Sequence, residues 1–267
     1  MTSEKDQHTR AQPGDLALLV ERGERPRILR IEPGRALESH KGILYHDELI
    51  GKSWGSEVKT HLGHAFLMLR PSLHDRVIHL RRISQIIYPK ESGYILLKMD
   101  IGSGSHVVEA GSGSGGLTVV LANAVRPNGR VTSYDARPDI QDRARQNVER
   151  EGLEHLVEFK VRDVAAGFDE RNVDAVFLDL PSPWDYLRQA HAALINGGFF
   201  GAIVPTTNQV SRLLTALHRA GFAQLEVEEI LLRPYKPVPT RLRPTDKMVA
   251  HTGFLIFARS LVLTEEE

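Results

Sequence analysis

The 267-residue chain has no cysteine, no long apolar run and no surplus of either charge. The lack of cysteine excludes disulfides, cysteine-ligated zinc and thiol catalysis, and it suits a reducing cytoplasm, where we expect the protein to work. No apolar run reaches the roughly 18 residues of a membrane span, so we expect no membrane association. The histidines are scattered and lack acids at ligand spacing, so we predict no metal site.

The 34 basic and 34 acidic residues balance, so net charge indicates no nucleic-acid partner. Their distribution is less even. Segments 70–90 and 233–247 each contain five basic residues and a single acidic one. Such segments can form a local anion-binding face or an ordinary solvated surface, and charge alone leaves both interpretations open.

Two domains are predicted along the chain, after a polar, disordered tail over residues 1–12. Short apolar runs at 16–20, 28–31, 42–45 and 65–69 predict a small β-rich N-terminal domain over residues 13–70. In residues 71–263, strands at about 106–110, 130–135, 156–161, 173–179 and 198–204 alternate with helices at about 115–125, 138–151, 184–194 and 208–220. This alternation predicts an α/β fold with a doubly wound, Rossmann-like parallel sheet. Strands at 225–232 and 253–261, joined by a Pro- and Arg-rich loop, close the chain.

The most informative stretch is Glu109-Ala110-Gly111-Ser112-Gly113-Ser114-Gly115-Gly116, between an apolar run and the helical pattern that begins at Leu117. A strand, glycine loop and helix in this order bring a ligand against bare backbone. The glycines satisfy G-x-G-x-x-G, which is typical of dinucleotide sites but weak alone. They also satisfy E-x-G-x-G-x-G, which resembles motif I of class I S-adenosylmethionine methyltransferases. Asp135, at the end of the next strand, suits ribose hydroxyls in both interpretations.

Two later acids favour the methyltransferase. Asp163 and Val164 follow the third strand, where an acid faces the cofactor adenine in enzymes of this class. Asp179 follows the fourth strand and opens Asp179-Leu180-Pro181-Ser182-Pro183-Trp184, which resembles the Asn/Asp-Pro-Pro-aromatic loop of enzymes that methylate amino groups on bases. Asp163 could instead cap a turn and Asp179 a helix. Trp184 could stack on a base, but packing in the core is favoured.

Four segments extend the resemblance to nearly the whole chain: 59–63, 85–90, 173–184 and 243–255. Together they resemble the catalytic subunit of tRNA adenine-58 N1-methyltransferases. The resemblance implies S-adenosylmethionine as cofactor, the T-loop adenine of tRNA as substrate and, for bacterial and archaeal members, a homotetramer. Asp135 departs from the family, which more often carries Glu, but the shorter acid can still reach a ribose.

The resemblance and the chemistry assign candidate roles. Asp179 is the predicted catalytic acid that stabilises the cation developing on the base, and Tyr88 flanks the base or is half-buried at a domain junction. His251 is not needed as a base. The residues expected to bind the cofactor are Gln85, Glu109, Gly111, Ser112, Gly113, Ser114, Gly115, Gly116, Leu117, Asp135, Asp163, Val164 and Asp179. Those expected to bind tRNA are Arg81, Arg82, Arg241, Arg243 and Lys247.

Three alternatives remain at this point. A class I methyltransferase acting on another RNA, a protein or a small molecule would explain the glycine loop, but not the segment after the fourth strand. A nicotinamide-dependent oxidoreductase needs a hydride-transfer acid that the sequence does not reveal. A non-catalytic RNA-binding partner on the same fold would be expected to have lost the glycine loop, which is intact here.

Overall fold

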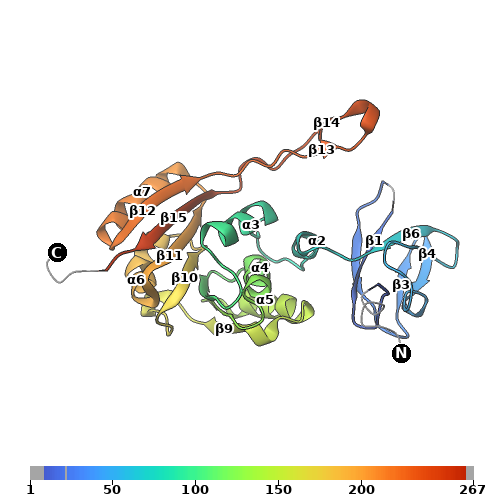
Figure 1. Cartoon of the computed structure of the whole chain (residues 1–267), viewed down its shortest axis with the longest axis horizontal. Helices are drawn as coiled ribbons and strands as arrows, with labels where there is room; N and C mark the ends of the chain where they lie inside the picture. The colour runs from blue at the N-terminus through green and yellow to red at the C-terminus, as the bar shows by residue number, and fades with distance from the viewer. Residues whose placement is uncertain (1–8, 22, 263–267) are drawn as a thin grey trace. The chain divides into compact units, whose positions relative to one another are not determined.

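The computed structural model describes residues 9–21 and 23–262. The chain divides into two compact units, of which the first ends at His79 and the second begins at Leu80 (Figure 1). The first eight residues of the predicted tail, and the acidic end at 264–267, lie outside the described residues. Residues 9–12 differ from the expected tail. Ala11 is fully buried because its small apolar side chain packs in the core of the N-terminal unit. Its backbone amide donates a hydrogen bond to the Lys52 carbonyl.

The N-terminal unit is β-rich, as predicted. Its antiparallel sheet has the order β2-β1-β6-β5, formed by β1 (Leu16–Val20), β2 (Arg27–Arg30), β5 (Glu57–Lys59) and β6 (Ala65–Leu69). A separate hairpin joins β3 (Ala36–Ser39) to β4 (Gly42–Tyr45), and η1 (His46–Glu48) follows it. Phe66 and Met68 alternate with exposed neighbours and point into the core. The helix α2 (Leu73–Ile78) closes the unit and starts at a capping box between Ser72 and Asp75.

The second unit is a seven-stranded sheet of order β12-β15-β11-β10-β7-β8-β9. Five strands are parallel: β7 (His106–Ala110), β8 (Arg130–Asp135), β9 (Val157–Val161), β10 (Val173–Leu178) and β11 (Leu194–Val204). Between β11 and β12 (Phe222–Glu228), β15 (Phe254–Ser260) runs antiparallel to both. The fold is therefore the predicted α/β class I methyltransferase type. None of the helices in the described part of the chain has the length and apolarity needed to cross a bilayer.

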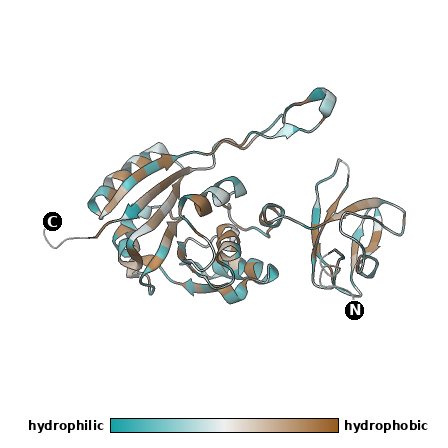
Figure 2. Ribbon diagram, viewed as in Figure 1, coloured by the Kyte–Doolittle hydropathy of each residue, from teal (hydrophilic) through white to brown (hydrophobic). Residues whose placement is uncertain are grey.

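The helix α3 (Pro89–Lys98) precedes β7, and helices then follow the strands in the predicted alternation: α4 (Gly116–Val125), α5 (Pro138–Arg150), α6 (Leu187–Ala193) and α7 (Thr207–Arg219). Short 3-10 turns are η2 (Glu154–Leu156), η3 (Val164–Ala166) and η4 (Pro183–Tyr186). On α7, Val210, Leu213 and Leu217 are buried at helical spacing, and Figure 2 shows the alternation of apolar and polar residues along this helix. The helix expected at 184–194 is split into η4 and α6, and β11 begins at Leu194, earlier than predicted.

The parallel strands end at one edge of the sheet, and this edge positions the site. The chain proceeds from β7 through β8 to β9 on one side and returns to β10 and β11 on the other. Open α/β sheets bind ligands where the strand order reverses in this way. The loops that follow β7 and β10 therefore meet where a ligand is expected.

A long excursion, residues 229–252, leaves the sheet between β12 and β15; we call it the arm. It carries a small hairpin of β13 (Tyr235–Lys236) and β14 (Arg243–Pro244), with η5 (Pro239–Arg241) between them. Figure 1 shows the hairpin projecting away from the sheet, in orange-red. The strand predicted at 225–232 begins earlier, at Phe222, and ends at Glu228, the last residue of β12 that pairs with β15. The next residue, Glu229, contacts His251 near the other end of the arm through its side chain.

Candidate active site

The glycine loop between β7 and α4 needs glycine for both conformation and space. Gly111, Gly113 and Gly115 have φ angles of 86°, 51° and 80°, in the left-handed region. A Cβ on Gly111 would lie 2.2 Å from the carbonyl oxygen of Asp179, and one on Gly116 would lie 2.9 Å from Cβ of Ile86. The loop is therefore packed directly against the segments that carry Asp179 and Ile86.

Glu109 lies beneath this loop. Its side chain is 1% exposed, and its Oε2 accepts hydrogen bonds of 2.6 Å from both the Thr118 and the Ser133 hydroxyls. The Ser112 and Ser133 hydroxyls are a further 2.7 Å apart. Burial raises the pKa of Glu109 to about 8, opposed by the two hydroxyl donors and reinforced by the negative charges of Asp179 and Asp135. Glu109 thus fixes the loop from below.

Ser114 fastens the segment before α3 to the loop. Its buried Oγ accepts from the amides of Ile83 and Ser84, each at 3.1 Å. Asn147 on α5 donates to the Ser114 carbonyl at 2.8 Å and to the Arg81 carbonyl at 2.9 Å. These bonds hold residues 81–85 across the glycine loop, which places Gln85 at the site.

The acids at the strand ends have distinct surroundings. Asp135 is 5% exposed and accepts from the Gly113 amide at 3.3 Å and from Arg137 Nε at 3.1 Å. Asp163 is exposed and accepts from the Ala165 amide at 2.9 Å, so it caps η3 as the alternative interpretation anticipated. The neighbouring Val164 and, on α4, Leu117 are buried.

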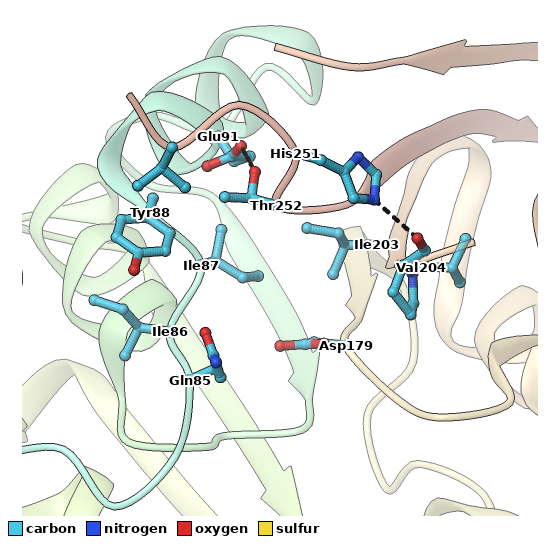
Figure 3. A pocket seen from close by; sticks show the side chains of 12 residues that line it. Gln85, Ile86, Ile87, Tyr88, Glu91, Asp179, Ile203, Val204, His251 and Thr252 are labelled. Carbon is cyan, nitrogen blue, oxygen red and sulfur yellow. Dashed lines mark hydrogen bonds between the residues drawn. The ribbon is translucent and has the colours of Figure 1, made fainter. Parts of the chain in front are cut away.

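A cavity of about 430 Å³ opens beside the loop, and Figure 3 shows Gln85 and Asp179 next to each other at this cavity, with the Asp179 carboxylate directed toward Gln85. Asp179 is held by a 2.7 Å hydrogen bond from its amide to the Ala110 carbonyl. Although its side chain is open to the cavity, desolvation by the surrounding protein and the charge of Asp135 raise its pKa to about 6. The cavity is lined by Gln85, Ile86, Ile87, Tyr88, Glu91, Asp179, Ile203, Val204, Pro205, Val249, His251 and Thr252.

The structure brings the two predicted catalytic residues, Asp179 and Tyr88, to this one cavity. The five basic residues predicted to bind tRNA are exposed, but none belongs to the described lining. Trp184 is partly buried and packs on the core, with the Arg212 guanidinium 4.4 Å from its ring. Val249 and Thr252 were not singled out from the sequence, although both lie in the segment 243–255 that carried the resemblance. The described residues contain no group of His, Asp or Glu arranged to hold a metal ion.

Comparison with known proteins identifies the family. A model described as the tRNA methyltransferase complex GCD14 subunit matches residues 64–242, and a TrmI-like N-terminal model matches residues 11–58. The chain belongs to the GCD14 family of tRNA methyltransferases. As a family member it resembles the tRNA (adenine(58)-N(1))-methyltransferase TrmI of Thermus thermophilus, with 35% identity over 93% of this chain and 98% of that protein.

Further relatives and solved structures are similar to this chain. The tRNA (adenine(57)-N(1)/adenine(58)-N(1))-methyltransferase TrmI of Methanocaldococcus jannaschii is 33% identical over 77% of this chain and 82% of its own length. The crystal structure of TrmI from Aquifex aeolicus matches with a TM-score of 0.82 and 35% identity, over 95% of this chain and 100% of that one. A Thermotoga maritima protein described as an S-adenosylmethionine-dependent O-methyltransferase matches with a TM-score of 0.90 and 41% identity, over 97% and 98% of the two chains.

Proposed function

We propose that this GCD14-family chain transfers a methyl group from S-adenosylmethionine to N1 of adenine 58 in tRNA. Relatives named for that reaction match it over nearly their full length. The observation that carries the proposal is the position of Asp179, a carboxylate that opens into the cavity beside the glycine loop. Together these features connect the family's substrate with a specific group in this chain.

The residues at the strand ends fit this cofactor, which supplies its methyl group as an electrophile on a positively charged sulfur. Bare backbone at Gly111, Gly113 and Gly115 permits close approach, and Asp135 suits the ribose hydroxyls. Burial is the main cause of the raised pKa of Glu109, and the negative charges of Asp179 and Asp135 add to it. A bound cation would offset the repulsion among these three carboxylates. We propose that the residues predicted from the sequence bind this cofactor. Glu109 and Ser114 contribute indirectly, because they hold the glycine loop and residues 83–84 in place.

The base needs positioning more than activation. Adenine N1 carries an in-plane lone pair and attacks without losing a proton. As positive charge spreads toward the exocyclic amine, the Asp179 carboxylate stabilises it. Tyr88, Ile87 and Val249 line the cavity and can exclude water around the base. Because the base is not reachable inside a folded tRNA elbow, it must be extruded into this cavity.

The affinity for the cofactor is expected to depend on pH. Asp179, whose pKa is raised to about 6, is largely neutral below that pH and charged above it. A cationic cofactor should therefore bind about tenfold more tightly at pH 8 than at pH 5. Calorimetry at both values checks this, with the neutral product S-adenosylhomocysteine as the control and Asp179→Asn as the variant that removes the difference. Equal affinity of the wild type at the two pH values would contradict the expectation.

Charges on the arm are expected to bind the tRNA backbone. Arg241, Arg243 and Lys247 are exposed there, and the acid of their segment, Asp246, pairs with Lys236. Replacing all three by Ala should weaken tRNA binding by about tenfold or more and reduce the slope of log K against log salt by about 2. Filter binding across a salt series measures both. Arg188→Ala with Arg219→Ala, on exposed sites of α6 and α7, should change neither. An unaltered salt slope in the arm variant would refute the electrostatic role.

The proposal is tested by incubating the protein with unmodified tRNA and labelled S-adenosylmethionine, followed by nucleoside analysis. The expected product is 1-methyladenosine, mapped to position 58. A second candidate, methylation of a hydroxyl, is favoured by the description of the Thermotoga maritima relative. Its product on tRNA would be a 2′-O-methylated nucleoside, which the same analysis separates. A tRNA that gains no label would overturn both tRNA activities and leave a protein or a small molecule as substrate.

We also propose a homotetramer, as the family resemblance implies. The arm exposes apolar side chains that association could cover: Leu231, Leu232, Tyr235, Val238 and Leu242 are 61%, 57%, 52%, 47% and 68% exposed. Sedimentation of the purified protein measures the state, and a monomer at micromolar concentration would reject this assignment.

A further inference from the structure

The ring of His251 lies between two hydrogen-bond acceptors. Its Nδ1 is 2.6 Å from Glu229 Oε1, and its Nε2 is 2.8 Å from the Pro205 carbonyl oxygen. A neutral imidazole has one N–H and can donate to only one of these acceptors, whereas an imidazolium satisfies both. The bonds to Glu229 and Pro205 raise the pKa of His251, opposed by partial burial and the charge of Lys90. The geometry therefore favours the charged ring.

The two bonds of His251 join three places in the fold. Pro205 directly follows β11 and lines the cavity. Glu229 directly follows β12 and begins the arm, whereas His251 lies near the arm's other end. The ring thus ties both ends of the arm to the edge of the sheet, and Figure 3 shows His251 above the cavity with its bond to the strand end.

A second, buried set of contacts secures the same place. Lys90 Nζ donates to the Ile230 carbonyl at 2.6 Å and to Thr252 Oγ1 at 2.8 Å, and it pairs with Glu91. The side chains of Lys90 and Glu91 are 7% and 1% exposed. They connect α3, which begins one residue after Tyr88, to the root of the arm, by which we mean residues 229–230 and 251–252. The root of the arm and the cavity wall are therefore one connected structure.

The groups that face His251 come from each element around it. Glu229 follows β12, the Pro205 carbonyl follows β11, and the ring of Phe254 on β15 lies 4.9 Å from the His251 ring. Lys90 of α3, already paired with Glu91, adds a positive charge nearby. Of these groups, the His251 ring is the one whose ordinary titration range is closest to neutrality. Gain or loss of a proton by His251 near neutral pH can therefore change the hydrogen bonds that hold the root of the arm.

We propose that His251, as an imidazolium, is a positioning residue that holds the arm root against β11 so that Val249 and Thr252 form the wall of the base cavity. The inference rests on the proposed tRNA methylation and adds a pH-dependent determinant of base capture. Loss of the proton breaks one of the two bonds, loosens this wall and lowers capture of the extruded adenine. His251 itself transfers no proton in the reaction.

The sign of the pH effect follows from the raised pKa. Both bonds are present below the pKa of His251 in the folded protein, and one is lost as the pH rises through it. The value of kcat/KM for tRNA should therefore decline on the alkaline side. The affinity for S-adenosylmethionine should not follow this decline, because His251 makes no contact with the glycine loop among the described hydrogen bonds.

The test compares kcat/KM for tRNA between about pH 6 and pH 9 in the wild type and three variants. Glu229→Gln removes the charge that favours the imidazolium and should move the alkaline decline about one pH unit lower. His251→Arg keeps two donors and a permanent charge, so the decline should disappear. His251→Gln should lose about tenfold across the range. His155→Gln, an exposed histidine beside β9, is the control and should match the wild type.

A direct titration of His251 by nuclear magnetic resonance separates this inference from the proposed function. The expected pKa lies above that of an exposed histidine, and Glu229→Gln should lower it. If the wild type methylates no tRNA, the proposed function fails, while the titration still tests the two bonds. The inference is overturned if Glu229→Gln leaves the titration or the alkaline decline unchanged, or if the decline persists in a folded His251→Arg. Should His251→Arg not fold, Glu229→Gln decides alone.

Discussion

Asp179→Ala is expected to lose about 10²–10³ in turnover of tRNA, the range for removing one preorganised electrostatic contact. The carboxylate opens into the cavity at the end of β10, where it can face the exocyclic amine of an extruded adenine. Asp179→Asn keeps the shape and one acceptor oxygen but lacks the charge, so its loss should be nearly as large. Single-turnover rates at saturating tRNA and S-adenosylmethionine measure the chemical step itself.

Stability provides the control for this prediction. Asp179 has its pKa raised to about 6 in the folded protein, so the fold favours its neutral form. The contribution of neutral Asp179 to the free energy of unfolding is present at low pH and is lost as the pH rises through about 6. At pH 8 neither variant should therefore melt below the wild type. Asp185→Ala, on the exposed surface of η4, should retain full turnover. Turnover near normal in Asp179→Ala would reject the assigned role.

The sequence was sufficient to predict the central sheet and the order of the site residues along it. Alternating strand and helix patterns predicted β7, β8, β9 and β10 closely, because this alternation is typical of a parallel sheet covered by helices on both faces. The start of β11 was predicted too late. In the N-terminal unit, β3 and β5 were missed. Residues such as Glu38, Glu57 and Lys59 make these strands short and polar, and they are held mainly by pairing with β4 and β6. Pairing of this kind leaves no periodic signal.

The meeting of Asp179 with the glycine loop could also be predicted, since the carboxyl ends of parallel strands share one edge of the sheet. The root of the arm could not. Lys90 contacts the Ile230 carbonyl across 140 residues of sequence, and His251 contacts the Pro205 carbonyl across 46. A backbone acceptor carries no side-chain signature, so the sequence could show that His251 is present but not which atoms it contacts.

Gly111→Ala is expected to reduce both S-adenosylmethionine affinity and turnover by about 10² or more. The new Cβ would lie 2.2 Å from the carbonyl oxygen of Asp179, which is backbone and cannot rotate away. Relief of this clash must displace the glycine loop or Asp179 itself, and a shift of about 1 Å at the reacting groups costs about 10²-fold. Calorimetry for the cofactor and single-turnover rates for tRNA measure the two losses.

Alanine substitutions at two further glycines separate the effect of this clash from the effect of backbone strain. Gly104 has a φ of 89°, close to the 86° of Gly111, but a Cβ there meets nothing within 4 Å. Gly104→Ala should therefore suffer the same conformational penalty, about 1 kcal/mol of stability, and keep its activity. Gly113→Ala should lie between the two, because its nearest atom at 3.3 Å is the Ser84 hydroxyl, which can move. If Gly104→Ala and Gly111→Ala lost activity equally, the contact between the glycine loop and Asp179 would not be what assembles the site.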